Sequence, residues 1–129
     1  MSLTATGASK FFTDGLFSTA VHAALMTSAS AEMTGTAYAR VSIDAYNATP
    51  ANSGWVVAGG SAKNRVKISW PAAGSGGWSA PVGVRLYDAA TGGNALTITA
   101  NFSTPPGALT AGSTIEIPAQ SFTITVPTG

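Results

Sequence analysis

The sequence contains no cysteine and a single histidine, and only 9% of its 129 residues are charged. The lack of cysteine excludes disulfide frameworks, thiolate zinc sites, iron–sulfur clusters and thiol nucleophiles. One imidazole leaves no room for a multi-histidine metal site. The formal net charge of +1 lacks the dense basic face that nucleic-acid binding normally requires. We therefore expect no metal, no cofactor and no nucleic-acid partner.

The scarcity of charged residues indicates what kind of surface the protein has. Charged residues make up about 25% of typical soluble domains, whereas Ala, Thr, Gly and Ser fill just over half of this chain. The surface is either polar through its Thr and Ser residues or largely covered by other protein. The second alternative is favoured because charge is depleted in interface cores. The length is that of one ordinary domain, so we predict a single domain over residues 1–129.

The apolar run at residues 16–26 has some features of a secretory leader or a membrane segment. Lys10 precedes it, and residues 29–31 fit a small-residue cleavage box. Polar residues interrupt the approach and the run: Asp14, Ser18, Thr19 and His22. We therefore expect no secretory leader. No run reaches the ~20 apolar residues that a membrane span needs, so we also expect no membrane partner.

From about residue 36 onward, apolar and polar residues alternate with a period of two, which predicts strands with one buried face. In residues 36–46 the inward face is predicted to carry Ala39, Val41, Ile43 and Ala45, and the wetter face Tyr38, Arg40, Ser42, Asp44 and Tyr46. The other alternating runs are 65–70, 82–87, 96–102, 115–117 and 122–126. Their predicted inward residues are Val66, Ile68, Trp70, Val82, Val84, Leu86, Leu96, Ile98, Ala100, Phe102, Ile115, Ile117, Phe122, Ile124 and Val126.

Short strands separated by Gly, Pro, Asn and Asp clusters predict an antiparallel, jelly-roll-like β-sandwich of about six to eight strands. Gly92 and Gly93 can supply the positive φ angles of a hairpin between two of these strands. A helical stripe over residues 8–17 predicts a short helix, so residues 1–17 are expected to form an N-terminal arm and helix. For residues 16–26, the pattern leaves helix and strand open.

No group of residues indicates catalysis, and we expect a non-enzymatic protein without catalytic residues. His22 lies in an apolar run with no orienting partner nearby, whereas a catalytic base needs one. It is therefore predicted to be a packed side chain. The carboxylates are isolated along the sequence, and Asp88 is predicted to begin a turn.

The candidate partner-contact residues are a basic cluster and two tryptophans: Lys63, Arg65, Lys67, Trp55 and Trp78. On a strand, the three basic residues would share one side. That side is either a solvated face or a contact for an acidic neighbouring protein. Trp55 and Trp78 border loops, where tryptophan anchors a corner or an interface; a sugar-stacking platform is the alternative. Trp70 alternates with other inward residues and is predicted to be core.

Several segments together resemble a family of small tailed-phage virion proteins, the tail-fibre-like or head-decoration proteins. The resemblance covers residues 8–127. Its most specific parts are Tyr38-Ala-Arg40, within a segment that begins at the acidic Glu32, and the turn over residues 88–93. Other matching segments are 15–17, 20–26, 68–73, 77–78, 109–117 and 122–126. The resemblance favours a strand over a helix for residues 19–26.

The resemblance implies a non-enzymatic structural protein of the phage virion, assembled in the cytoplasm of the host bacterium. We expect a capsid decoration (cement) protein that bridges and stabilises capsid subunits. The alternatives are a tail or tail-fibre component and a module that binds host glycans. The implied partners are the major capsid protein or tail proteins of the same virion. The resemblance also implies a homo-oligomer, with a trimer favoured.

Overall fold

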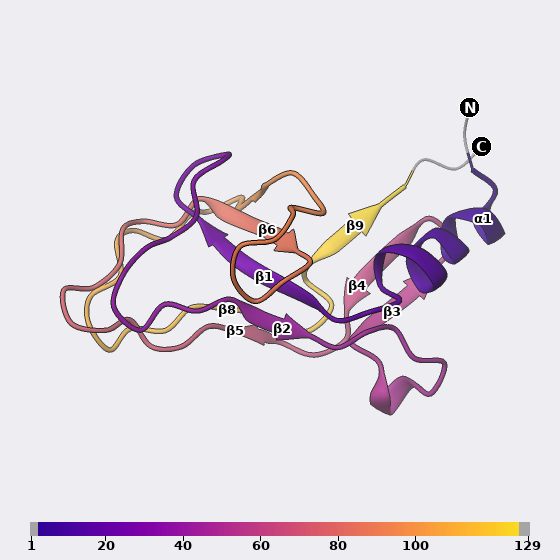
Figure 1. Ribbon diagram of the computed structural model, residues 1–129, viewed down its shortest axis with the longest axis horizontal. Coiled ribbons are helices and arrows are strands. Elements are labelled where there is room, and N and C mark those ends of the chain that lie inside the picture. The colour runs from indigo at the N-terminus through magenta and orange to yellow at the C-terminus, as the bar shows by residue number, and fades with distance from the viewer. Residues whose placement is uncertain (1–2, 127–129) are drawn as a thin grey trace. The chain divides into compact units, whose positions relative to one another are not determined.

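The computed structural model describes residues 3–126 (Figure 1). Met1 and Ser2 of the predicted N-terminal arm, and residues 127–129, lie outside the described residues. The described chain divides into two compact units. The first comprises residues 3–21, 43–68 and 117–126, and the second comprises residues 22–42 and 69–116. Our prediction of a single domain stays a prediction.

The fold class is mainly β, with antiparallel sheets and one short N-terminal α-helix, as predicted. Residues 3–126 contain nine strands, slightly more than the six to eight predicted. The helical elements are α1 (Ala5–Lys10), the π-helical η1 (Phe11–Leu16) and the 3₁₀ turn η2 (Pro50–Asn52). The strands are β1 (Val21–Met26), β2 (Val41–Ile43), β3 (Trp55–Ala58), β4 (Ser61–Asn64), β5 (Ile68–Ser69), β6 (Gly83–Tyr87), β7 (Ala100–Asn101), β8 (Glu116–Ile117) and β9 (Thr123–Thr125).

The strands form three sheets. The largest has the order β2-β1-β6-β7, the second β3-β4-β9, and β5 pairs with β8. The pairings of β1 with β6, β6 with β7, β3 with β4 and β4 with β9 are antiparallel. In Figure 1, β1 and β6 lie side by side. The sheet order places β7 next to β6.

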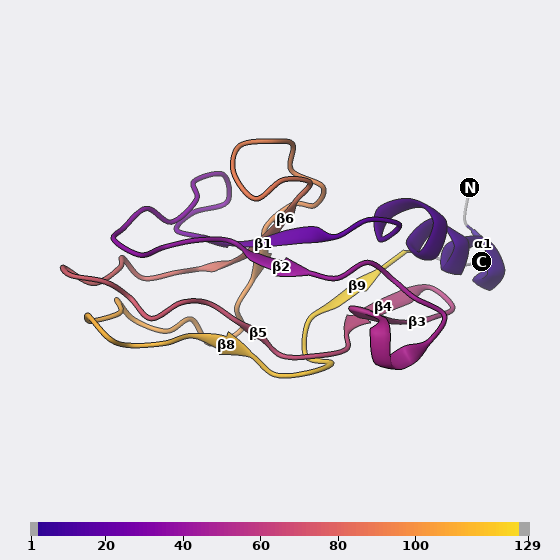
Figure 2. The same cartoon turned by 60° about the horizontal axis from the view of Figure 1, so that its bottom comes forward.

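In the first unit, the helical segment is positioned by one cap and one buried stripe. The Thr4 hydroxyl accepts a hydrogen bond from the Gly7 N–H at 3.0 Å, which caps α1. Ala8 and Phe12 of the predicted helical stripe are buried, whereas Phe11 is 49% exposed. Ser9 Oγ donates to the carbonyl of Gly59 at 3.1 Å, so α1 lies against the β3–β4 turn (Figure 2). Within residues 3–126, no helix is long and apolar enough to cross a bilayer.

An aromatic stack joins the helical segment to the β3-β4-β9 sheet. Phe17 stacks on Trp55 with ring centroids 3.8 Å apart and on Phe12 at 5.8 Å. Phe122 lies against the other side of this group, 6.4 Å from Trp55. Each aromatic pair contributes about 0.5–1.5 kcal/mol beyond its buried area. The stack therefore forms the core of the first unit.

The hairpin of β3 and β4 was not predicted from the sequence. Ala58 pairs with Ser61, which leaves Gly59 and Gly60 as a two-residue turn with Gly59 at a φ of +56°. Two adjacent glycines are a known signal for such a turn. The hairpin could therefore have been found from the sequence.

The predicted strand over residues 65–70 is wrong in its first half, because Asn64 ends β4. The buried Asn64 amide donates to the carbonyls of Val66 and Pro118, at 2.8 and 3.0 Å. Its Oδ1 accepts from the Phe122 N–H at 2.8 Å. The bond to Val66, two residues on, turns the chain. Val66 is consequently exposed rather than inward, while Ile68 and Trp70 are buried as predicted.

Residues 21–26 form the strand β1, of which residues 22–26 belong to the second unit. This resolves the alternative that the sequence left open. β1 pairs with β6 from His22 opposite Tyr87 to Met26 opposite Gly83. Leu25 in β1 and Val84 and Leu86 in β6 are buried. The indole N–H of Trp70 donates to the carbonyl of Ala23 at 3.2 Å, which fixes this core tryptophan beside β1.

The inward face predicted for residues 96–102 is wrong. Only Ala100–Asn101 is strand, Leu96 and Ala100 are exposed, and Ile98 is 86% exposed. The intervening threonines are half-buried instead, because their hydroxyl groups make hydrogen bonds that hold them inward. Thr97 Oγ1 accepts from the Leu86 N–H, and Thr99 Oγ1 donates to the carbonyl of Ala29.

The Asn64 contacts generate a prediction about stability. Asn64→Ala removes the three hydrogen bonds made by a buried side chain. The Val66 and Pro118 carbonyls and the Phe122 N–H then lack these partners. We expect a loss of about 2–4 kcal/mol in the free energy of unfolding, measured by urea denaturation. Asn52→Ala, an exposed asparagine of the same unit, is the matched control and should change stability by less than about 0.5 kcal/mol. Equal effects would contradict the assigned role.

Candidate functional site

Both tryptophans proposed for partner contact are buried within their own units. Trp55 is 1% exposed and Trp78 is 3% exposed. Trp55 lines a cavity of about 170 Å³ together with Tyr46, Pro50, Val56 and other residues, and its indole N–H has no hydrogen-bond partner among the described residues. A sugar-stacking platform needs exposed rings, so the glycan alternative based on these two residues is wrong. Their aromatic area instead serves the core.

The basic cluster is not a row on one strand. Lys63 is exposed on β4, whereas Arg65 and Lys67 follow the strand after the turn at Asn64. The Arg65 guanidinium donates to the carbonyls of Ser53 and Ala51. Arg65 therefore stabilises the η2 loop of the first unit. A partner contact by these basic residues stays a prediction.

The remaining candidate chemistry is dispersed. His22 lies half-buried in β1 opposite Tyr87. Residues 3–126 hold no group of three or more His, Asp or Glu side chains that could bind a metal ion. Asp88 begins a turn, as predicted: its Oδ1 accepts from the Asn94 N–H at 2.7 Å, and its Oδ2 accepts from the Asn94 side-chain amide at 3.3 Å.

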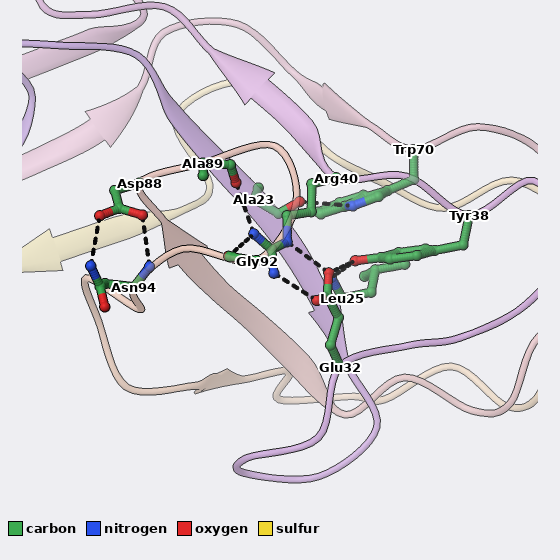
Figure 3. Close-up of polar contacts among 10 residues, drawn as sticks. All are labelled: Ala23, Leu25, Glu32, Tyr38, Arg40, Trp70, Asp88, Ala89, Gly92 and Asn94. Carbon is green, nitrogen blue, oxygen red and sulfur yellow. Dashed lines mark hydrogen bonds and ion pairs between the residues drawn. The ribbon is translucent and has the colours of Figure 1, made fainter.

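The most connected group of polar side chains is centred on Arg40 (Figure 3). Its Nε and Nη2 donate to the two carboxylate oxygens of Glu32, at 2.9 and 2.8 Å. Its Nη1 donates to the carbonyls of Ala89 and Gly92, both at 2.8 Å. The guanidinium also lies over the Tyr87 ring, 3.8 Å from its centroid. We call Glu32, Tyr38 and Arg40 with these acceptors the Arg40 network.

Tyr38 connects the network to the sheet. Its hydroxyl donates to Glu32 Oε2 at 2.7 Å and accepts from the Leu25 N–H at 3.1 Å. Its ring meets Trp78 edge-on, with centroids 5.5 Å apart. Gly35 makes room for this indole, since a Cβ at position 35 would lie 2.6 Å from Trp78 Cδ1. The loop after β1 is thus held against the core of the second unit.

The same network holds the turn after β6. Gly92 and Gly93 adopt φ angles of +60° and +70°, as their hairpin prediction required. A Cβ at Gly93 would meet Asp88 Oδ1 at 2.4 Å. The compact turn directs the Ala89 and Gly92 carbonyls toward Arg40, as Figure 3 shows. One guanidinium therefore ties together two loops about 50 residues apart in sequence.

The network shifts the pKa values of its members in consistent directions. The hydrogen bond from Arg40, with a further one from Tyr38, lowers the pKa of Glu32 below its ordinary value. Burial, together with the bond to Glu32, raises the pKa of Tyr38, and the bond to Glu32 raises that of Arg40. The Asn94 backbone N–H lowers the pKa of Asp88. At neutral pH, Glu32 is ionised and Tyr38 is a neutral donor.

A cleft of about 450 Å³ lies beside the network. Its lining residues are Glu32, Met33, Thr34, Gly35, Tyr38, Ala39, Arg40, Ala90, Thr91 and Gly92. The Arg40 side chain is only 6% exposed and the Glu32 side chain 25%. Because Arg40 already uses four of its five N–H donors, the arrangement fixes loop geometry at the cleft. It holds the backbone of the two loops at the cleft in one shape.

The sequence pointed to these residues without predicting their role. Tyr38 and Arg40 were placed on the wetter face of a strand over residues 36–46, with Ala39 inward. The strand is confined to Val41–Ile43, and Ala39 is exposed. Ala37 has a φ of +70°, which interrupts the extended backbone and turns Tyr38 and Arg40 toward Glu32. The resemblance segment from Glu32 to Arg40 was the available signal.

Comparison with known proteins gave one family. A family described as podophage GP4 fiber I protein gp80 matches residues 10–125. The match includes the Arg40 network, the Asp88–Asn94 turn, and most of the described parts of both units. No curated protein matches the chain.

The Arg40 network predicts a stability effect at one carboxylate. Glu32→Gln replaces two charge-assisted bonds from Arg40 and leaves a largely buried guanidinium without its anion. We expect a loss of about 2 kcal/mol in the free energy of unfolding at pH 7. Asp14→Asn makes the same chemical change at an exposed site and should have little effect. A similar loss for both variants in denaturant titrations would contradict the network's role.

The lowered pKa of Glu32 also predicts a pH dependence. A carboxyl with a folded-state pKa below 4.5 stabilises the folded protein above pH 4.5. This stabilisation is lost as the pH falls through the lower, folded-state pKa. The difference in unfolding free energy between the wild type and Glu32→Gln should therefore be constant near neutral pH and shrink below about pH 4.5. An unchanged difference down to pH 3 would refute this assignment.

Proposed function

We propose that the chain, which belongs to the family of the podophage GP4 fiber I protein gp80, is a non-enzymatic structural subunit of a phage fiber. The observation that carries the proposal is the family match over residues 10–125. As a member of a phage fiber family, the chain is a structural component of the virion. Its place on the particle and its neighbours are the subjects of the proposal.

The geometry of the Arg40 network supports a role in contact rather than in catalysis. Its charged groups are bound to one another and to main-chain carbonyls, so they stiffen the loops at residues 32–40 and 88–94. Rigid loops bind with a smaller loss of conformational entropy. A fiber subunit that must hold neighbouring proteins in a set geometry benefits from this property.

The family match favours the tail-fibre alternative over the capsid decoration that we first expected. Both functions depend on contacts with other proteins. A stable protein–protein interface buries about 1,600 Å² of accessible surface in total. The partners of a fiber subunit would be tail proteins of the same virion and further copies of the chain, with a trimer as our expectation. Assembly would take place in the cytoplasm of the host bacterium.

The location can be tested on intact particles. Gold-labelled antibodies raised against the purified chain should bind at the fibers in electron micrographs. Antibody absorbed beforehand with the purified chain is the control and should leave particles unlabelled. Label spread regularly over the capsid would support decoration and overturn the fiber assignment. Particles that lack the chain altogether would overturn the virion role.

A further inference from the structure

The segment from Leu96 to Asn101 carries an apolar row that faces outward. Leu96 is 37% exposed, Ile98 is 86% exposed and Ala100 is exposed, while Thr97 and Thr99 between them are half-buried. In a half-buried strand, the apolar row normally faces the core. Here the alternation is kept but its direction is reversed. We call residues 96–101 the Ile98 edge.

The reversed direction is held by specific hydrogen bonds. The Arg85 Nε donates to the carbonyl of Thr97 at 3.1 Å, and Thr97 Oγ1 accepts from the Leu86 N–H at 3.1 Å. Thr99 Oγ1 donates to the carbonyl of Ala29 at 2.7 Å. Both threonines are thereby kept inward, so Ile98 between them points to solvent.

A bulge accompanies these bonds. The Leu96 N–H donates to the Leu86 carbonyl, and farther along the pair Ala100 lies opposite Val84. Between these two pairs, β6 contributes one residue, Arg85, whereas the opposite segment contributes three, residues 97–99. Bulges re-aim side chains and terminate regular pairing. The outward position of Ile98 is thus built into the pairing of β6 with this segment.

We propose that the Ile98 edge is a docking surface for a second copy of this chain. β7 is the last strand in the order β2-β1-β6-β7, so within residues 3–126 one side of its backbone is unpaired in the sheet. Charged residues and prolines commonly protect such edges from pairing. No charged residue stands between Asp88 and Glu116, and no proline between Pro81 and Pro105. This edge lacks both kinds of protection.

The absence of charge favours a second copy over an unrelated partner. When two copies of a strand edge meet about a two-fold axis, a charge near the axis lies close to its own copy. Like charges placed opposite each other destabilise strand pairs. The Ile98 edge avoids this cost because its side chains are Leu, Thr, Ile, Ala and Asn. It also offers no charge that a complementary partner could match. The net charge of +1 adds little repulsion between whole chains.

This inference rests on the proposed function, in which further copies of the chain are partners, and it names the surface through which they would bind. Its test uses the purified chain and does not depend on where the chain lies on the virion. The association of the purified chain is measured by sedimentation equilibrium over a range of concentrations. The wild type should form a species larger than the 12.8 kDa monomer. Ile98→Asp should raise the dissociation constant at least tenfold, because it places like charges at the contact.

Val56→Asp is the matched control. Val56 is also apolar and 40% exposed, and it lies on β3, an edge strand of the other unit. It should associate like the wild type, and circular dichroism should report the same fold for all three proteins. A wild type that stays monomeric overturns the proposal, as does an equal effect of the two variants. If the chain associated only with another virion protein, the proposal of a second copy would be overturned and that protein would be the partner.

Discussion

The structure depends on one requirement: backbone N–H and carbonyl groups outside the sheets must still find hydrogen-bond partners. The strands are two to six residues long, so much of the chain lies in loops. Side chains supply many of the missing partners. All three arginines, Arg40, Arg65 and Arg85, donate to main-chain carbonyls of loops. The buried Asn64 does so at the end of β4.

This requirement explains what the few charged side chains of the protein do. The Arg40 charge is neutralised by Glu32 and satisfied by two loop carbonyls, so it stiffens loops instead of repelling other molecules. The outer surface is then largely Thr, Ser, Ala and Gly. Such a surface suits a virion protein of the fiber family, since close packing with neighbouring subunits requires little desolvation of charge.

Sequence periodicity predicted both the strand and its buried residues at two of the alternating runs. Residues 82–87 and 122–126 contain β6 and β9, with Val84, Leu86 and Phe122 buried as predicted. It failed where a local bond competes with extended structure, as at Ala37 and Asn64. Among the candidate site residues, Trp55 and Trp78 were predicted to anchor a corner or an interface, and both are buried. Their burial, however, follows from aromatic packing with residues far apart in sequence.

The sequence by itself determined the fold class, the absence of thiol chemistry and the turn at Asp88, because composition, two-residue alternation and glycine positions act locally. Only the tertiary structure decided which face of residues 96–101 points inward. An alternating segment such as 96–101 can present either face, and the choice follows from partners on other segments, here Arg85, Leu86 and Ala29. The bond of Arg40 to two distant loops was decided in the same way, since local patterns carry no record of which carbonyls come within reach.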